Sequence, residues 1–313
     1  MEPIIRVEQL VKQYRKAKQP AVDNISFAVE PGEFFALLGP NGAGKTTTIS
    51  ILTTTLAKTS GRVTVAGYDL DRQAREIRAA VGIIFQKPSL DLDLTAEENI
   101  RLHVCIHGLY AYRPLYRLMP AEYRLKVEEL AEVVGLGADL FKLLKTFSGG
   151  MQRKLEIIRS LMPDPQVLFL DEPSAGLDAL SRSNLWQYLQ QVRRLKQTTI
   201  FLTTHYIEEA EDADHVCIVN KGQVALHTTP DKMKQRLIDR YILVDSPDHD
   251  RLAAELTGHG IRFTGNGSGF KIPYQEATPQ ALIAGLGTPL SLLKVHEPSL
   301  EEAYVDLLVK GAA

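Results

Sequence analysis

The sequence has 313 residues, of which 44% are hydrophobic and 24% are charged, so it has the composition of an ordinary globular protein. Its formal net charge of −2 gives no overall basic surface, and we therefore expect no nucleic-acid partner. Two cysteines are too few for a disulfide framework, and no run approaches the roughly 20 apolar residues of a membrane-spanning helix. We expect a cytosolic protein. If it acts at a membrane, we expect it to do so through a partner protein.

Residues 1–230 alternate short apolar runs with longer helical patterns, which is typical of an α/β sheet domain. The strand-like runs are Phe34–Leu38, Val81–Phe85, Val167–Leu170, Thr199–Thr203 and His215–Val219. From about residue 90 to 160 the pattern is mostly helical, with a Tyr- and Arg-rich insert at 108–120. We therefore predict a core sheet with a helical subdomain set into it.

Residues 231–313 have a different texture and predict a small accessory α+β domain. Strand-like segments at 241–244 and 290–295 enclose a helix at 251–256, a hairpin within 262–274 and a helix at 279–286. This β-α-β-β-α-β order is that of a ferredoxin-like module. A final helix is predicted after Ser299, which forms a capping box with Glu302. Nothing in this module suggests chemistry of its own.

The strongest chemical signal is a complete G-x-x-x-x-G-K-[ST] pattern after the strand FFALL and before a helical run. It consists of Gly39, Pro40, Asn41, Gly42, Ala43, Gly44, Lys45 and Thr46. Glycines of such a loop let backbone N–H groups surround a β-phosphate, and the lysine reaches the β- and γ-oxygens. The Thr46 hydroxyl is a candidate ligand for Mg²⁺. This segment predicts a nucleoside triphosphate site.

Two adjacent carboxylates, Asp171 and Glu172, follow the apolar strand VLFL. A strand cannot bury an aspartate without a partner, and a metal ion beside the phosphate loop would be that partner. Because side chains alternate along a strand, the two carboxylates should point differently. We therefore predict that Asp171 holds Mg²⁺ and that Glu172 is the general base for an attacking water.

Three further residues are candidate site residues only because the phosphate loop and the two carboxylates are also present. His205 ends the strand before it and is predicted to sense the γ-phosphate and to orient the water, because ligands collect at the carboxyl ends of parallel strands. Gln86 follows another strand, where its amide can touch Mg²⁺ or the water. Tyr14 has a ring that can stack on a purine. Taken singly, each of them would be interpreted as a structural residue, and only the other motifs favour a role in the site.

The stretch Ser148-Gly149-Gly150 raises the question of a second phosphate site. Ser148 is placed to cap the helix that follows, and a helix start with free N–H groups is a ready anion site. The chain already has a phosphate loop a hundred residues earlier, so the segment needs another explanation.

The motifs GPNGAGKTT, Gln86, FSGGMQ, VLFLDEP, SAGLD and TTH occur together, in the order of an ATP-binding cassette (ABC) ATPase, which residues 4–230 resemble. The resemblance implies ATP and Mg²⁺ as ligands, with Thr47 among the ATP contacts. It also implies a head-to-tail dimer in which Ser148, Gly149 and Gly150 hold the ATP bound to the second copy, while Asp178 couples the two sites at the seam. The signature segment of this family, residues 147–151 here, usually begins with Leu and has Gln as its fifth residue. This chain has Phe147 and Met151 at those two positions.

Within that family, LTAEENI, DEPSAGLDALSR and the terminal SLEEAYVDLL resemble ATPases of drug-resistance, ABC-2-type exporters. The resemblance implies a subunit that dimerises, most simply as a homodimer, and drives a separate integral membrane permease from the cytoplasmic face of the membrane. An importer ATPase and a soluble ABC protein without a transport role stay open as alternatives. The 108–120 insert offers Tyr and Arg side chains to a membrane partner, or is a solvated loop. The accessory domain is expected to pack on its own cassette or on the second copy.

Overall fold

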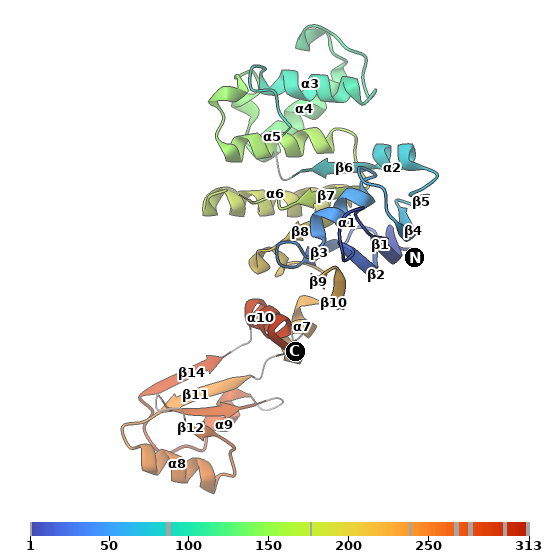
Figure 1. Ribbon diagram of the computed structural model, residues 1–313. Helices are drawn as coiled ribbons and strands as arrows, with labels where there is room; N and C mark the ends of the chain where they lie inside the picture. The colour runs from blue at the N-terminus through green and yellow to red at the C-terminus, as the bar shows by residue number, and fades with distance from the viewer. Residues whose placement is uncertain are drawn as a thin grey trace. The chain divides into compact units, whose positions relative to one another are not determined.

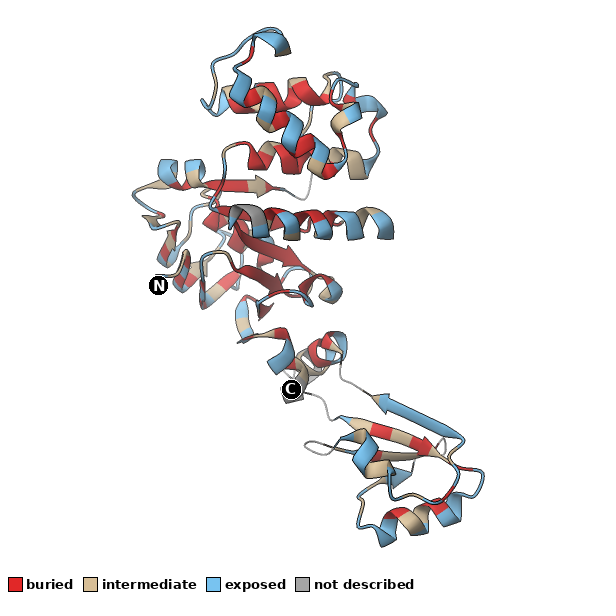
Figure 2. Ribbon diagram, turned by 180° about the vertical axis from the view of Figure 1, so that it is seen from behind, coloured by how far each residue is buried: buried red, intermediate tan, exposed pale blue. Residues whose placement is uncertain are grey.

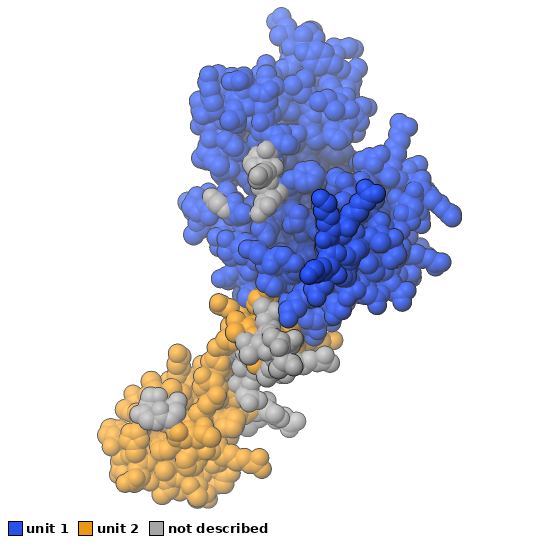
Figure 3. Space-filling view, viewed as in Figure 1, with its two compact units in different colours: residues 1–228 blue, residues 229–313 orange. Residues whose placement is uncertain are grey.

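The computed structural model describes residues 2–85, 89–175, 177–237, 240–265, 269–274, 278–296 and 299–310. Gln86 and Gly176 lie outside these ranges. The chain divides into two compact units, residues 1–228 and 229–313 (Figure 3), whereas the sequence suggested a boundary after residue 230.

The first unit is built on a six-stranded sheet in the order β10-β9-β3-β8-β7-β6 (Figure 1). Five of its strands are parallel and are the apolar runs predicted from the sequence. In sheet order, the strands are β10 (Gln223–Thr228), β9 (His215–Asn220), β3 (Phe34–Leu38), β8 (Thr199–Thr204), β7 (Val167–Asp171) and β6 (Val81–Ile84). Every residue of β3, β7 and β8 is buried (Figure 2), which explains why these strands are continuous apolar runs.

A second, antiparallel sheet in the order β2-β1-β4-β5 was not recognised in the sequence. Its strands are β1 (Ile5–Lys12), β2 (Val22–Val29), β4 (Ser60–Val65) and β5 (Tyr68–Asp69). Buried and exposed residues alternate along β2, so no continuous apolar run marks it. Its inner face joins the core of the first sheet, where the Phe27 and Phe35 rings stack with centroids 5.3 Å apart.

The predicted helical subdomain is present and contains three α-helices and short 3₁₀ turns. Its helices are α3 (Ala96–Ile106), α4 (Ala121–Val134) and α5 (Gly149–Leu161), with turns η1 (Tyr116–Leu118), η2 (Gly137–Asp139) and η3 (Leu144–Thr146). The core of the unit carries α1 (Lys45–Leu52), α2 (Ala74–Ala80), α6 (Ala179–Lys196) and turn η4 (Ile207–Ala210). Helix α1 ends at Leu52, where the Thr53 and Thr55 hydroxyls donate to carbonyls of its last turn.

The second unit contains a four-stranded antiparallel sheet in the order β12-β13-β11-β14, with a core beneath two helices. Its elements are α7 (Pro230–Leu237), β11 (Tyr241–Asp245), α8 (His249–Gly258), β12 (Thr264–Gly265), β13 (Phe270–Pro273), α9 (Pro279–Ile283), β14 (Leu292–His296) and α10 (Leu300–Lys310). The order from β11 to β14 is the predicted ferredoxin-like one. The capping box of Ser299 and Glu302 is formed through two hydrogen bonds of 3.1 Å.

Within the described part of the chain, none of the helices combines the length and the apolar character that crossing a membrane requires.

Candidate functional site

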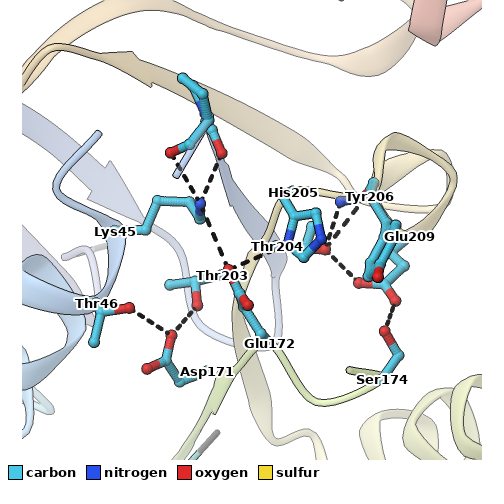
Figure 4. A network of polar contacts seen from close by, with 12 residues as sticks. Lys45, Thr46, Asp171, Glu172, Ser174, Thr203, Thr204, His205, Tyr206 and Glu209 are labelled. Carbon is cyan, nitrogen blue, oxygen red and sulfur yellow. Dashed lines mark hydrogen bonds and ion pairs between the residues drawn. The ribbon is translucent and has the colours of Figure 1, made fainter. Parts of the chain in front are cut away.

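Parallel pairing brings the predicted catalytic residues to one edge of the six-stranded sheet (Figure 4). The phosphate loop follows β3, Asp171 is the last residue of β7, and His205 follows β8. These strands are neighbours and run in the same direction, so their carboxyl ends lie side by side. Segments that are far apart in the sequence thus form one site where ligands bind in such sheets.

Two glycines of the phosphate loop are required by their surroundings. Gly44 precedes α1 with a φ of +106°, and a Cβ atom there would lie 2.4 Å from the Ala21 carbonyl oxygen. A Cβ atom on Gly39 would lie 2.4 Å from the Val219 carbonyl oxygen. A side chain at either position would therefore displace backbone. The loop turns directly into α1 at Lys45, so its N–H groups lie at a helix start.

Lys45 is 5% exposed and is the cation of the site. Its Nζ atom donates to the Gly39 carbonyl at 2.7 Å and to the Pro40 carbonyl at 3.3 Å. It also lies 3.6 Å from Oε1 of Glu172. Burial lowers the pKa of Lys45, and the carboxylates of Glu172 and Asp171 partly offset that effect. A second source of negative charge, such as a phosphate, would stabilise this ammonium group.

Asp171 is 4% exposed and accepts hydrogen bonds from two hydroxyls, at 2.5 Å from Thr203 Oγ1 and 3.4 Å from Thr46 Oγ1. Burial raises the pKa of Asp171, while the Thr203 hydrogen bond lowers it. The Asp171 carboxylate and the Thr46 hydroxyl both offer oxygen atoms, which are the ligands that Mg²⁺ prefers. Thr203 was not among the predicted site residues, because a threonine inside an apolar strand carries no separate signal.

Glu172 has a left-handed backbone conformation with a φ of +48°, which is uncommon for a residue other than glycine. Its backbone N–H donates to the Thr203 carbonyl at 3.0 Å, which extends the pairing of β7 and β8 beyond the last strand residue. Its Oε1 atom lies 3.2 Å from Nδ1 of His205. Backbone conformations of this kind are found preferentially at functional sites.

Tyr14 lies in the loop after β1, beside the start of α1. Its hydroxyl is 3.5 Å from the hydroxyl of Thr47, and the Nζ atom of Lys12 lies 5.2 Å from the centre of its ring. Tyr14 is 43% exposed, which leaves surface for stacking. Gln86, the remaining predicted contact, lies outside the described residues.

The Ser148-Gly149-Gly150 segment begins α5, and Ser148 caps this helix as predicted by accepting from the Met151 N–H at 3.3 Å. Ser148 and Gly149 are exposed. No hydrogen bond among the described residues joins the segment to the phosphate loop of the same chain. The segment is therefore an exposed helix start, a place where backbone N–H groups can bind an anion.

Asp178 caps α6, close to the same helix start. It accepts from the Ser181 N–H at 2.9 Å and from the Ser181 hydroxyl at 2.7 Å, which lowers the pKa of Asp178. A Cβ atom on Gly150 would lie 2.9 Å from that hydroxyl. The structure thus places Asp178 and the signature glycines as neighbours on the surface of one chain.

Two buried charged residues at the site were missed. Glu209 is 4% exposed and accepts from the hydroxyls of Thr204, at 2.5 Å, and Ser174, so it joins the loops that follow β8 and β7 (Figure 4). Arg153 of α5 binds the carbonyls of Glu172 and Pro173. In the sequence each is one charged residue in a helical pattern, and only the fold shows its partners.

Comparison with known proteins decides the family. A family model described as "ABC transporter" matches residues 22–175. The linearmycin resistance ATP-binding protein LnrL of Bacillus subtilis is 31% identical over 97% of this chain and 98% of its own. A daunorubicin resistance ATP-binding protein of Streptomyces coeruleorubidus is 38% identical over 74% of this chain and 69% of its own. The chain belongs to the ABC transporter ATP-binding proteins.

Solved structures agree with this assignment. A bacterial ABC transporter cassette solved as a dimer is 25% identical, with a TM-score of 0.63 over 72% of this chain and 98% of its own. The same scores hold for a cassette in a dimeric post-hydrolysis state bound to ADP and phosphate. The ABC ATPase fold, the nucleotide-binding function and the class of ATP hydrolase predicted from the sequence are thereby confirmed.

Proposed function

We propose that two copies of this chain bind two ATP molecules between them, head to tail, and that this closure powers an exporter. The proposal rests on the observation that the chain has two separate candidate phosphate-binding segments. Lys45 and its loop lie at the sheet edge, while Ser148 and the signature glycines form an exposed helix start joined to that loop by no described hydrogen bond. A second copy supplies the missing wall of each site, and the dimeric cassettes among similar structures support this arrangement.

The chemistry we assign to the site is hydrolysis of the terminal phosphate of ATP. Water attacks the γ-phosphorus, the bond to the β–γ bridging oxygen breaks, and ADP and phosphate leave. Glu172 accepts the proton of the attacking water as general base. His205, 3.2 Å from Glu172, orients this carboxylate and the γ-phosphate, and Lys45 stabilises the charge that develops on the phosphate oxygens.

Asp171, Thr46 and Gln86 are the residues we assign to Mg²⁺. Among the described residues, no group of three or more His, Cys, Asp and Glu side chains gathers around one point. That fits Mg²⁺, which commonly uses one or two protein oxygens together with water and substrate phosphates. When bound, the ion neutralises charge on the β- and γ-phosphate oxygens.

A separate integral membrane permease is the partner we propose for the dimer, which would place the chain at the cytoplasmic face of the membrane. Relatives named for drug resistance and for Nod factor export favour an exporter over an importer or a soluble ABC protein. The insert at 108–120 can contribute exposed side chains to that contact, namely Tyr112, Arg113 and Arg117.

Two other tyrosines of the insert are partly buried and have contacts within the chain. Tyr110 and Tyr116 both contact the buried ring of Tyr123 edge to face, and the Tyr116 hydroxyl donates to Glu128 at 2.8 Å. They anchor the insert to α4 instead.

The dimer is tested with Glu172→Gln, which keeps the size of the side chain and removes the base. We expect this variant to bind ATP, to lose steady-state hydrolysis by at least about 100-fold, and to elute as a dimer with ATP but as a monomer without it. The phosphate-loop variant Lys45→Ala is the matched control, since it should fail to dimerise. Hydrolysis by Glu172→Gln at the wild-type rate would refute the assigned base.

The partner is tested separately by affinity purification from gently solubilised native membranes, followed by mass spectrometry. A polytopic membrane protein in stoichiometric amount is the expected result. Recovery of ribosomal or DNA-associated proteins in its place would favour the soluble alternatives and would leave the ATPase assignment unchanged.

A further inference from the structure

Arg153 reaches from the signature helix α5 into the loop that carries the catalytic glutamate. Its side chain is 5% exposed and lies five residues after Ser148 in the sequence. The Nε atom donates to the Pro173 carbonyl at 2.7 Å, and Nη2 donates to the carbonyl of Glu172 at 3.3 Å. The guanidinium group therefore holds two consecutive backbone carbonyls, those of Glu172 and Pro173.

The same side chain also holds the end of β6. Its Nη1 atom donates to the Phe85 carbonyl at 2.6 Å and to Oε2 of Glu156 at 2.7 Å. The other oxygen of Glu156 accepts from the Ser89 N–H at 3.2 Å. One turn further along α5, Arg159 donates to the Ser89 carbonyl at 2.7 Å.

These three side chains lie at intervals of three residues on one face of α5. Together, Arg153, Glu156 and Arg159 bind the backbone on both sides of residues 86–88. Of these three side chains, Arg153 is the one whose hydrogen bonds among the described residues also reach the loop after β7. Its planar fork of donors is rigid, so it fixes several carbonyls relative to one another as a flexible ammonium group would not.

We propose that Arg153 is a positioning residue for ATP hydrolysis, one that fixes the Glu172 loop to the helix that Ser148 begins. The inference rests on the proposed ATP sandwich. In that dimer, α5 closes over the ATP of the second copy, while Glu172 of the same chain acts on the ATP at its own phosphate loop. Arg153 would therefore link the two ATP sites through one side chain, so that Glu172 takes its position when the signature segment closes.

The test compares Arg153→Met, which removes the donors, with Arg153→Lys, which keeps the charge. We expect Arg153→Met to lower kcat by about 10-fold or more while the Kd for ATP, measured by calorimetry, changes less than about twofold, because the phosphate loop is intact. Arg153→Lys should recover part of kcat, since an ammonium group can still reach one or two of the carbonyls. A wild-type kcat in Arg153→Met would overturn the proposal.

Arg101→Met is the matched control for a general effect of removing a buried arginine. Arg101 is also 5% exposed in the helical subdomain and pairs with Glu97 at 3.1 Å, but its described contacts are remote from the catalytic loop. We expect a comparable loss of thermal stability in both variants and a fall in kcat of the folded protein only for Arg153→Met. An equal fall in both would assign Arg153 a merely structural role and overturn the proposal.

A double-mutant cycle with Ser148→Ala tests the link itself. If Arg153 transmits the closing of α5, Ser148→Ala should lower kcat by a smaller factor in the Arg153→Met chain than in the wild type. Independent, multiplicative effects would overturn the link. ATP-driven dimerisation of Glu172→Gln is measured in parallel: its absence would count against the proposed ATP sandwich, whereas a dimer together with a wild-type kcat in Arg153→Met would count against this inference alone.

Discussion

The Nδ1 atom of His205 lies 3.2 Å from the Oε1 atom of Glu172, although the two residues follow different strands. The short distance between these two side chains is set by the backbone. The parallel pairing of Asp171 with Thr203 is continued by a hydrogen bond from the Glu172 N–H to the Thr203 carbonyl. Because Glu172 and His205 come directly after the ends of these paired strands, the register of β7 with β8 sets the histidine against the carboxylate.

Replacing His205 by alanine should therefore disable hydrolysis without preventing ATP binding. We expect kcat to fall by about 10²–10³-fold, the usual cost of one positioned catalytic donor, with little change in the Kd for ATP. Steady-state phosphate release and calorimetry measure the two quantities.

The control for that variant is His215→Ala. His215 begins β9, at the opposite end of the sheet, where its Nδ1 atom lies 2.6 Å from Glu33. This substitution should lower stability and leave kcat per folded molecule unchanged. Equal losses of activity in the two variants would contradict the role of His205.

Tyr14 should contribute to nucleotide affinity through its exposed ring. Stacking of a base on an aromatic side chain contributes about 1–3 kcal/mol, so Tyr14→Ala should weaken ATP binding by roughly 5- to 150-fold. Tyr14→Phe keeps the ring and loses the contact with the Thr47 hydroxyl, so it separates the two contributions. Wild-type affinity in Tyr14→Ala would remove this residue from the ATP site.

The helical subdomain should lose stability in acid through His103. Burial, the charge of Arg159 and His107 together lower the pKa of His103 to about 3. The unfolded chain takes up a proton near pH 6.5, whereas the folded chain does not, so this stability is complete above pH 6.5 and is lost as the pH falls toward 3. At pH 4 the loss should be on the order of 3 kcal/mol.

His103→Gln measures this contribution, because glutamine does not titrate and its amide oxygen can still accept from Arg159, as the ring nitrogen is positioned to do. The free energy of unfolding of the wild type should fall more steeply between pH 7 and pH 4.5 than that of the variant. Parallel pH dependences would show that His103 is not the responsible group.

The catalytic core could be predicted from the sequence because its strands are buried on both faces and are followed by charged residues. The runs that contain Phe34 and Val167 are continuously apolar. The loop that leads to Lys45 follows the first run, and Asp171 and Glu172 follow the second. Strands β1 and β2 escaped prediction because exposed residues interrupt their apolar pattern, and β5 has only two residues.

Contacts between distant segments were the part of the site that no local pattern could show. Glu209 binds Ser174 and Thr204, and Arg153 binds carbonyls of two segments, the end of β6 and the loop after β7. Such partners become defined only when strands and helices pack. The position of Thr203 against Asp171 likewise depends on the register of β7 with β8.

Residues 1–228 should bind ATP when produced alone. Every described residue assigned to the phosphate loop, the metal site and catalysis lies in this unit, which has its own hydrophobic core. We expect the truncated chain to unfold cooperatively and to bind ATP within about threefold of the full chain, or about 0.7 kcal/mol. Calorimetry on both chains measures the affinity, and thermal unfolding verifies the fold. A folded truncated chain that fails to bind ATP would show that residues 229–313 are integral to the nucleotide site. Retained ATP binding with weakened dimerisation of the truncated Glu172→Gln chain would instead assign those residues to the contact between copies.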